Sequence, residues 1–252
     1  MVVGTTKRST APARAVEEGL AFAGLVALAL IPPLLYLLWL RSRERYDREP
    51  VGPVLGAFVY GGSVGVGVAV LLHILFDFGY RQSGGPFPLE DAFVAAVVIA
   101  PVVEEFAKAL GLGRFRRRIQ ELEDGIIYGA GLGLGFAATE NLVYGVTALL
   151  DGGFGDAIVT ILVRVVSSML LHSGASALLG FGYGVAVLRG RGLWSLLPYY
   201  VVAVLLHAVY NYLVSTRQLI GLAVAVIMVA YVATTLRRRI ERLDEESARV
   251  YG

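Results

Sequence analysis

Residues 125–150 read GIIYGAGLGLGFAATENLVYGVTALL. As a helix rising about 1.5 Å per residue, this run is long enough to cross the roughly 30 Å hydrocarbon core of a membrane. Glu140 is its only ionisable side chain apart from two tyrosines, and Gly125, Gly129 and Gly133 recur at every fourth position. Such a spacing of small residues lets helix backbones approach closely. The stretch therefore predicts a transmembrane helix inside a tightly packed helical bundle.

Similar apolar runs lie on both sides of this one, and together they predict about seven spans. The first is not a cleavable signal peptide, because its arginine cluster follows the apolar stretch instead of preceding it. The fifth is longer than a membrane requires, so it is tilted, begins as an interfacial segment, or is broken near residues 173–174. The seven runs cover residues 19–40, 51–76, 92–112, 125–150, 157–188, 193–214 and 218–236.

The composition of the 252 residues supports a membrane protein. Hydrophobic residues make up 56%, charged residues only 17%, and the mean hydropathy is +0.68. Too little polar surface remains to cover a soluble particle, so a soluble enzyme, a disordered chain and a nucleic-acid-binding domain all fit poorly. The absence of cysteine excludes disulfides, thiolate nucleophiles and Cys-ligated metals.

Charge in the connecting segments predicts the direction of the chain. Residues 41–50, 113–124, 189–192 and 237–252 hold fifteen Lys and Arg, whereas the alternate segments hold five. Because basic loops stay in the cytoplasm, the N-terminus is expected outside and the C-terminus inside. We therefore predict an all-α, multi-pass protein of the cell membrane, with an extracytoplasmic tail (1–18), one transmembrane domain (19–236) and a basic cytoplasmic tail (237–252).

A few ionisable side chains fall inside the predicted spans. Charged groups in hydrocarbon cost several kcal/mol (about 2.5 to 3.5 on insertion scales), so function is their default explanation. Counting residues from the cytoplasmic ends of the spans places a carboxylate or imidazole group on each of four helices roughly 15 to 25 Å deep in the membrane. The charged groups are Glu104, Glu105, Lys108, Glu140 and Arg164, and the histidines are His73, His172 and His207.

Helical spacing gathers these groups on common faces. Lys108 follows Glu104 by four residues and Glu105 by three, so its ammonium can lie beside either carboxylate. His207 and Asn211 are also four apart and are expected to aim an imidazole and an amide at the same place.

Two chemistries remain open for this set. A glutamate in an apolar cavity can take a proton from water while an imidazole and an amide stabilise the oxyanion. Alternatively, a divalent metal such as Zn²⁺ can be held and make hydroxide. The metal ligands would come from Glu105, Glu140, His172 and His207.

Each group also has a purely structural explanation. The Glu104, Glu105 and Lys108 cluster could be an interhelical ion-pair lock, and the polar groups of the remaining helices could cross-link them by hydrogen bonds. We favour a functional role for these groups, because two adjacent carboxylates are more than an interhelical ion pair requires. His73 is interpreted as a surface imidazole, and Arg164 as a side chain that extends to the membrane boundary.

Four motifs carry a resemblance to a known family. They are APVVEEFAKALGL (100–112), DGIIYGAGLGLGFAATENLVYG (124–145), LLHSGAS (170–176) and HAVYN (207–211). In order and spacing they resemble the PrsW family of intramembrane proteases, which is related to the CAAX prenyl endopeptidases. The first and seventh spans carry none of the resemblance.

The resemblance implies roles for several residues. Glu104 and Glu105 match the paired glutamates of an EExxK motif closed by Lys108, and one of the two would be the general base. Glu140 ends an F-x-x-x-E motif where the CAAX relatives have histidine, and we hypothesise that His172 takes that histidine's place. His207 and Asn211 match H-x-x-x-N, whose role in the CAAX relatives is the oxyanion hole.

The resemblance also implies cleavage of membrane-anchored regulators such as anti-sigma factors. The expected partners are therefore a membrane-embedded protein substrate and the bilayer, with no nucleic acid, and a homodimer through the glycine-rich helix faces is also open. A proton- or ion-coupled transporter is the main rival function, because buried Glu, His and Lys also form proton relays. A serine protease using Ser176 with His207 and a non-catalytic scaffold are weaker rivals.

Overall fold

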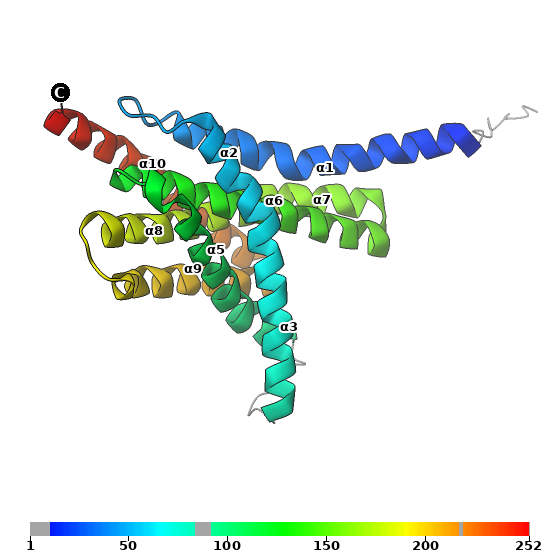
Figure 1. Ribbon diagram of the computed structural model, residues 1–252. Helices are drawn as coiled ribbons and strands as arrows, with labels where there is room; N and C mark the ends of the chain where they lie inside the picture. The colour runs from blue at the N-terminus through cyan, green and yellow to red at the C-terminus, as the bar shows by residue number, and fades with distance from the viewer. Residues whose placement is uncertain (1–10, 84–91, 217–218, 252) are drawn as a thin grey trace, which may run out of the picture.

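The computed structural model describes residues 11–83, 92–216 and 219–251, and these residues are helical almost throughout, with no strand among them (Figure 1). The predicted all-α class is confirmed. The helices are α1 (Ala11–Arg41), α2 (Val51–Tyr60), α3 (Val66–Ser83), α4 (Ala92–Val94), α5 (Ala100–Phe115), α6 (Leu122–Gly152), α7 (Phe154–Val166), α8 (Ser168–Leu188), α9 (Leu197–Ser215) and α10 (Leu219–Tyr251). Two π-helical segments, Gly61–Gly65 and Ala95–Ile99, join α2 to α3 and α4 to α5.

Six helical segments among the described residues are long and apolar enough to cross a membrane. The predicted run at 92–112, which carries three charged side chains, corresponds to the continuous helix from α4 to α5 and is not one of the six. It is the most highly charged of the predicted spans. The six segments are Ala15–Arg41, Val51–Gly79, Leu122–Gly152, Phe154–Leu188, Leu193–Ser215 and Leu219–Glu246.

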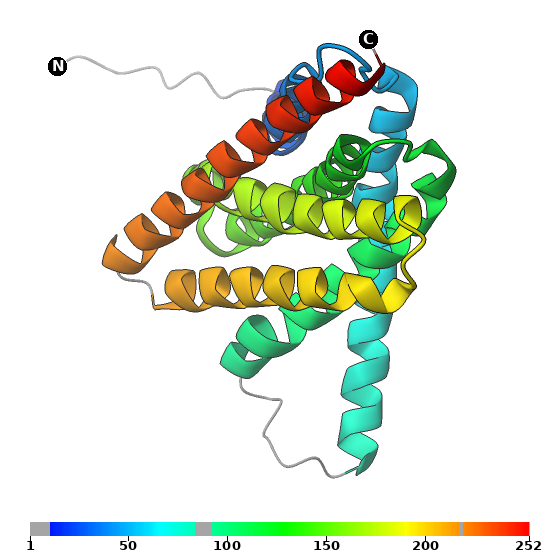
Figure 2. The same cartoon turned by 90° about the vertical axis from the view of Figure 1, so that its left-hand side faces the viewer.

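Helix α6 lies at the centre of the bundle and packs along α8 (Figures 1 and 2). A methyl group on Gly129 or Gly133 would overlap the backbone oxygen of Ser176 or His172, respectively, so only glycine allows this approach. The glycine face predicted from the sequence is thus used inside the chain. It is not available to a second copy, and the expected homodimer would need another surface.

The long fifth run is divided in the structure. Helix α7 ends at Val166 and α8 begins at Ser168, so the break falls at Ser167, a few residues before the expected 173–174. The hydroxyl of Ser167 donates to the carbonyl of Val163 in the preceding turn. A serine that bonds its own helix backbone in this way favours a bend.

The segment between α1 and α2 is fixed to the rest of the chain by buried carboxylates. Asp244 of α10 accepts the backbone amides of Arg45 and Tyr46 at 2.8 and 3.1 Å, and Tyr128 of α6 donates its hydroxyl to Glu49. Helix α10 continues without a break through residues 237–251. The predicted basic tail is therefore the end of this helix, and it packs against the α1–α2 connection.

Candidate active site

Five helices bring ionisable side chains to one place in the bundle. Helix α5 contributes Glu104, Glu105 and Lys108, whose spacing puts them on its inward side. The other members are Glu140 of α6, Arg164 of α7, His172 of α8 and His207 of α9. The structure thus gathers all the carboxylate, ammonium and imidazole groups that the sequence singled out, except His73, and it adds Arg164.

All of these side chains except Glu104 form a continuous polar chain. The Lys108 ammonium lies 2.8 Å from Glu105 Oε1 and 2.7 Å from His172 Nδ1. The other nitrogen of His172 is 2.8 Å from Glu140 Oε2, and His207 Nδ1 is 2.9 Å from Glu105 Oε1. Every neighbour in the chain is therefore within hydrogen-bonding distance of the next.

The chain is enclosed by the helices. Glu105 is fully buried, and Lys108, His172 and His207 are at most 2% exposed. The Lys108 ammonium also lies 4.4 Å from the centre of the Phe136 ring, which gives it a cation–π contact. Charges so far from water are retained only when paired; Lys108 pairs with Glu105 within α5, and Glu140 of α6 pairs with Arg164 of α7.

Glu104 differs from its neighbour Glu105. Both carboxylates have a buried Oε2 without a hydrogen-bond partner among the described residues, but Glu104 keeps a small exposed fraction, 9%, whereas Glu105 is fully buried. The nearest cations are distant: Lys108 Nζ and His207 Nε2 both lie 3.9 Å from this oxygen. An unpaired carboxylate oxygen in a charged cavity has its acceptor capacity free for a water, a metal or a substrate proton.

Helices α5, α8 and α9 bring side-chain atoms that can bind a metal close together. One ligand atom each from Glu104, His172 and His207 lie within 4.8 Å of one another. Two histidines and one carboxylate are a donor set found in catalytic zinc sites, and carboxylates on the second nitrogen of each histidine are typical of such sites. Glu105 and Glu140 hold those second positions, whereas from the sequence they are expected as ligands. The donor chemistry therefore fits a divalent ion.

Lys108 limits that fit. Its ammonium contacts His172 Nδ1, the nitrogen that is left once Nε2 bonds Glu140. An ion bound to this nitrogen requires the ammonium to withdraw toward Glu105, with which it is already paired at 2.8 Å.

Arg164 is the member of the candidate site that sequence reasoning missed. Its position in the sequence predicts a side chain at the membrane boundary, but its guanidinium pairs with Glu140 Oε2 at 2.8 Å and donates to Asn141 Oδ1 at 3.0 Å. Arg164 also donates to the hydroxyl of Ser168 at 3.1 Å and lies over the Tyr144 ring. It provides the counter-charge for a carboxylate that would otherwise be isolated in the bundle.

Asn211 lies apart from the polar chain. Its side-chain amide donates to the carbonyl of Ala96 at 2.8 Å, in the π-helical segment before α5. That carbonyl lacks its usual partners, because the Ala100 amide donates to Ala95 and Pro101 has no N–H. Asn211 therefore satisfies a backbone group left open by the proline and joins α9 to the start of α5. The expected convergence of Asn211 with His207 does not occur.

We expect Asn211→Ala to lower the free energy of unfolding by roughly 1 to 2 kcal/mol, because the Ala96 carbonyl loses its donor. Adding Pro101→Ala restores an amide N–H next to this carbonyl and should recover most of the lost stability. Thermal unfolding of the single and double variants in detergent measures this, and equal melting temperatures for wild type and Asn211→Ala would contradict it.

Ser176 has no role that the geometry supports. Its buried hydroxyl has no hydrogen-bond partner among the described residues, and the His207 ring bonds Glu105 instead. His73 lies half-buried on α3 and takes no part in the polar chain. The serine mechanism therefore lacks the nucleophile–base contact that it needs.

Comparison with known proteins identifies the family. The sequence model described as PrsW family intramembrane metalloprotease matches residues 49–236. The chain is 26% identical to Protease PrsW of Clostridioides difficile (strain 630) over 88% of its length and 90% of that protein. It is 29% identical to Protease PrsW of Geobacillus kaustophilus (strain HTA426) over 85% and 90%, and 26% identical to that of Bacillus subtilis (strain 168) over 76% and 83%. No solved structure gives a significant match.

The matched region contains all four motifs and every member of the polar chain. It extends over most of the chain and nearly the whole length of the first two relatives, so the likeness concerns the entire helical bundle. The transporter function has no support from these matches. This multi-pass membrane protein belongs to the PrsW family of intramembrane metalloproteases.

Proposed function

We propose that this protease hydrolyses a peptide bond of a membrane-anchored protein with water that Glu104 activates inside the bilayer. The observation that carries the proposal is the unpaired Oε2 of Glu104, in a cavity shared with His172, His207 and Lys108. Glu105 is the poorer base, because its Oε1 accepts from both Lys108 and His207 and it has no exposed surface.

The reaction proceeds in two steps. Glu104 takes a proton from water, and the resulting hydroxide oxygen forms a bond to the scissile carbonyl carbon, giving a tetrahedral oxyanion. The Lys108 ammonium and the His207 imidazole stabilise this negative charge. Glu104 then returns the proton to the amide nitrogen as the C–N bond breaks, which releases a carboxylic acid and an amine.

The remaining polar side chains hold Glu104, Lys108 and His207 in position. Glu105 pairs with Lys108 and accepts from His207, so it fixes both side chains relative to Glu104. Glu140 orients the His172 ring and is itself held by Arg164. Asn211 and Ala96 fix the start of α5, which carries the base.

The metal implied by the family name would be held by Glu104, His172 and His207. When bound there, a divalent ion supplies Lewis acidity to the attacking water and the scissile carbonyl. The orienting groups keep the same tasks in that case: Glu105 and Glu140 orient the two imidazoles, and Arg164 balances the charge of Glu140.

We further propose a single-span regulator, such as an anti-sigma-factor-like protein, as the substrate. The predicted orientation and the position of Glu104 within α5 put the reacting groups at mid-membrane or toward the outer side. Cleavage at that depth would release the substrate from its anchor.

Reconstitution tests this proposal. The purified protein is placed in liposomes with a tagged single-span protein, and fragments are identified by mass spectrometry. We expect two fragments whose new ends lie within the transmembrane segment, and Ser176→Ala should cleave within about twofold of wild type. A chelator arm separates the metal-dependent form from the metal-free form. Loss of cleavage in Ser176→Ala alone would replace the glutamate mechanism with a serine mechanism.

A further inference from the structure

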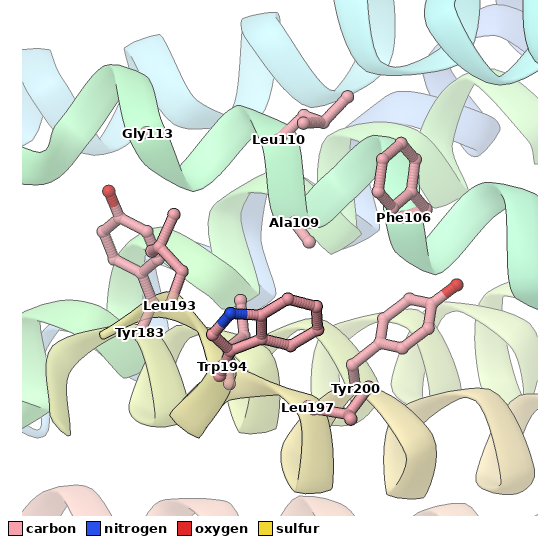
Figure 3. Close-up of a pocket in the computed structure, with 10 residues that line it drawn as sticks. Phe106, Ala109, Leu110, Gly113, Tyr183, Leu193, Trp194, Leu197 and Tyr200 are labelled. Carbon is pink, nitrogen blue, oxygen red and sulfur yellow. The ribbon is translucent and has the colours of Figure 1, made fainter. Parts of the chain in front are cut away.

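An apolar groove lies between α5 and the start of α9 (Figure 3). It has a volume of about 620 Å³ and opens beside the end of α5 that precedes the Arg116–Arg118 cluster. Its surface is almost wholly hydrocarbon, with the hydroxyls of Tyr183 and Tyr200 and the indole N–H of Trp194 as exceptions. The lining residues used below are Phe106, Ala109, Gly113, Trp194 and Tyr200.

The groove lies beside the candidate active site. Phe106, which lines it, directly follows Glu105 in α5. Tyr200 crosses from α9 and donates its hydroxyl to the carbonyl of Val102 at 2.7 Å, two residues before Glu104. One wall of the groove is thus the helix that carries Glu104 and Glu105, and Tyr200 joins the opposite wall to that helix.

A substrate must open a path to these buried groups, and two of the other helix seams are closed by backbone contacts. Helix α6 contacts α8 through glycines that touch backbone, and Gly135 of α6 meets the Phe58 carbonyl of α2 in the same manner. On the groove side, side-chain hydrogen bonds join α9 to α5, from Tyr200 to the Val102 carbonyl and between His207 and Glu105. A chain can therefore enter the α5–α9 seam by displacing side chains.

We propose that this groove, lined by α5 and α9, holds the transmembrane segment of the protein substrate and delivers its scissile bond to Glu104. The proposal rests on the protease function above. Tyr200 and the Val102 carbonyl are a donor and an acceptor that a peptide backbone can engage when their mutual bond opens, whereas a lipid acyl chain can replace neither. Trp194, 86% exposed at the mouth, suits the membrane–water boundary where a substrate segment would enter.

Substitutions at two separate helical glycines, Gly113 and Gly67, test the proposed groove without disturbing the fold. Gly113 lines the groove, and a side chain added there meets nothing within 4 Å. Gly113→Leu should narrow the groove while favouring the helix, so we expect cleavage of the tagged single-span protein to fall about tenfold or more with no loss of thermal stability. Gly67→Leu, at an equally open helical glycine on α3, is the matched control and should cleave like wild type. Equal cleavage by both variants would overturn the proposal.

Tryptophan fluorescence tests the occupant independently of catalysis. Trp39 and Trp194 are the only tryptophans, so Trp39→Phe leaves Trp194 as the sole reporter of the groove. In liposomes of brominated phosphatidylcholine, lipid in the groove quenches Trp194. A tryptophan-free peptide with the transmembrane sequence of the tagged protein should restore the emission in a saturable manner, and Gly113→Leu should weaken this response.

The cleavage and fluorescence experiments together distinguish a failure of the proposed protease activity from a failure of the proposed groove. Emission restored without any cleavage would refute the proposed protease activity on that protein but support the groove. Cleavage with no change in Trp194 emission, and with no effect of Gly113→Leu, would keep the activity and refute the groove. Quenching that no peptide relieves would identify lipid as its occupant.

Discussion

Replacing Glu104 by glutamine is expected to reduce cleavage of a membrane-anchored substrate by about 10²- to 10⁴-fold, the range that general acid–base catalysis contributes. The amide keeps the size of the side chain but can no longer accept a proton from water. Since Glu104 Oε2 has no hydrogen-bond partner among the described residues, the substitution breaks no bond at that atom. We therefore expect the thermal stability of Glu104→Gln to be close to that of wild type.

The measurement is the single-turnover rate in liposomes, beside the melting temperature of each variant. Ser173→Ala, which removes another buried polar atom without a hydrogen-bond partner from the same bundle, is the matched control and should retain its rate. Metal content of purified wild type, Glu104→Gln and His207→Ala adds a second observable. If a stoichiometric ion is present, both variants should lose it. A Glu104→Gln protein that cleaves normally would remove Glu104 from the role of base.

Much of the fold could be predicted from sequence because a membrane imposes simple rules. The length of the apolar runs indicated the helices, and the four-residue glycine spacing indicated the face of α6 that contacts α8. The helical spacing of Glu105 and Lys108 likewise anticipated their ion pair, which is local to one helix.

Contacts between distant helices were harder to predict. Arg164 lies near the end of α7, where an arginine commonly extends to the membrane boundary, and nothing in its neighbourhood indicates Glu140 as its partner. The bond from Asn211 to Ala96 joins residues 115 positions apart and depends on a π-helical segment. Pro101 was a signal that could have suggested it, because a proline within a helix leaves a carbonyl to be satisfied elsewhere.

The second large effect is expected on stability. Lys108→Met should lower the free energy of unfolding by about 3 to 5 kcal/mol, the range for removing one partner of a buried ion pair. Lys108 is 1% exposed and its ammonium contacts both Glu105 and His172, so its loss leaves the fully buried Glu105 carboxylate with His207 alone. Cleavage should be lost as well, because the same ammonium faces the reacting carboxylate. Denaturant unfolding in detergent micelles measures the stability of this variant.

A double variant separates the structural part of this effect from the chemical part. Lys108→Met with Glu105→Gln removes both members of the pair and leaves no isolated carboxylate, so most of the stability should return. Cleavage should not return, because the cation that stabilises the oxyanion is still missing. Leu71→Met, at an exposed position on α3 outside the groove, controls for the methionine and should match wild type in both measurements. Recovery of cleavage along with stability would mean that Lys108 serves only as an ion-pair lock between helices, which is the structural explanation that the paired glutamates argue against.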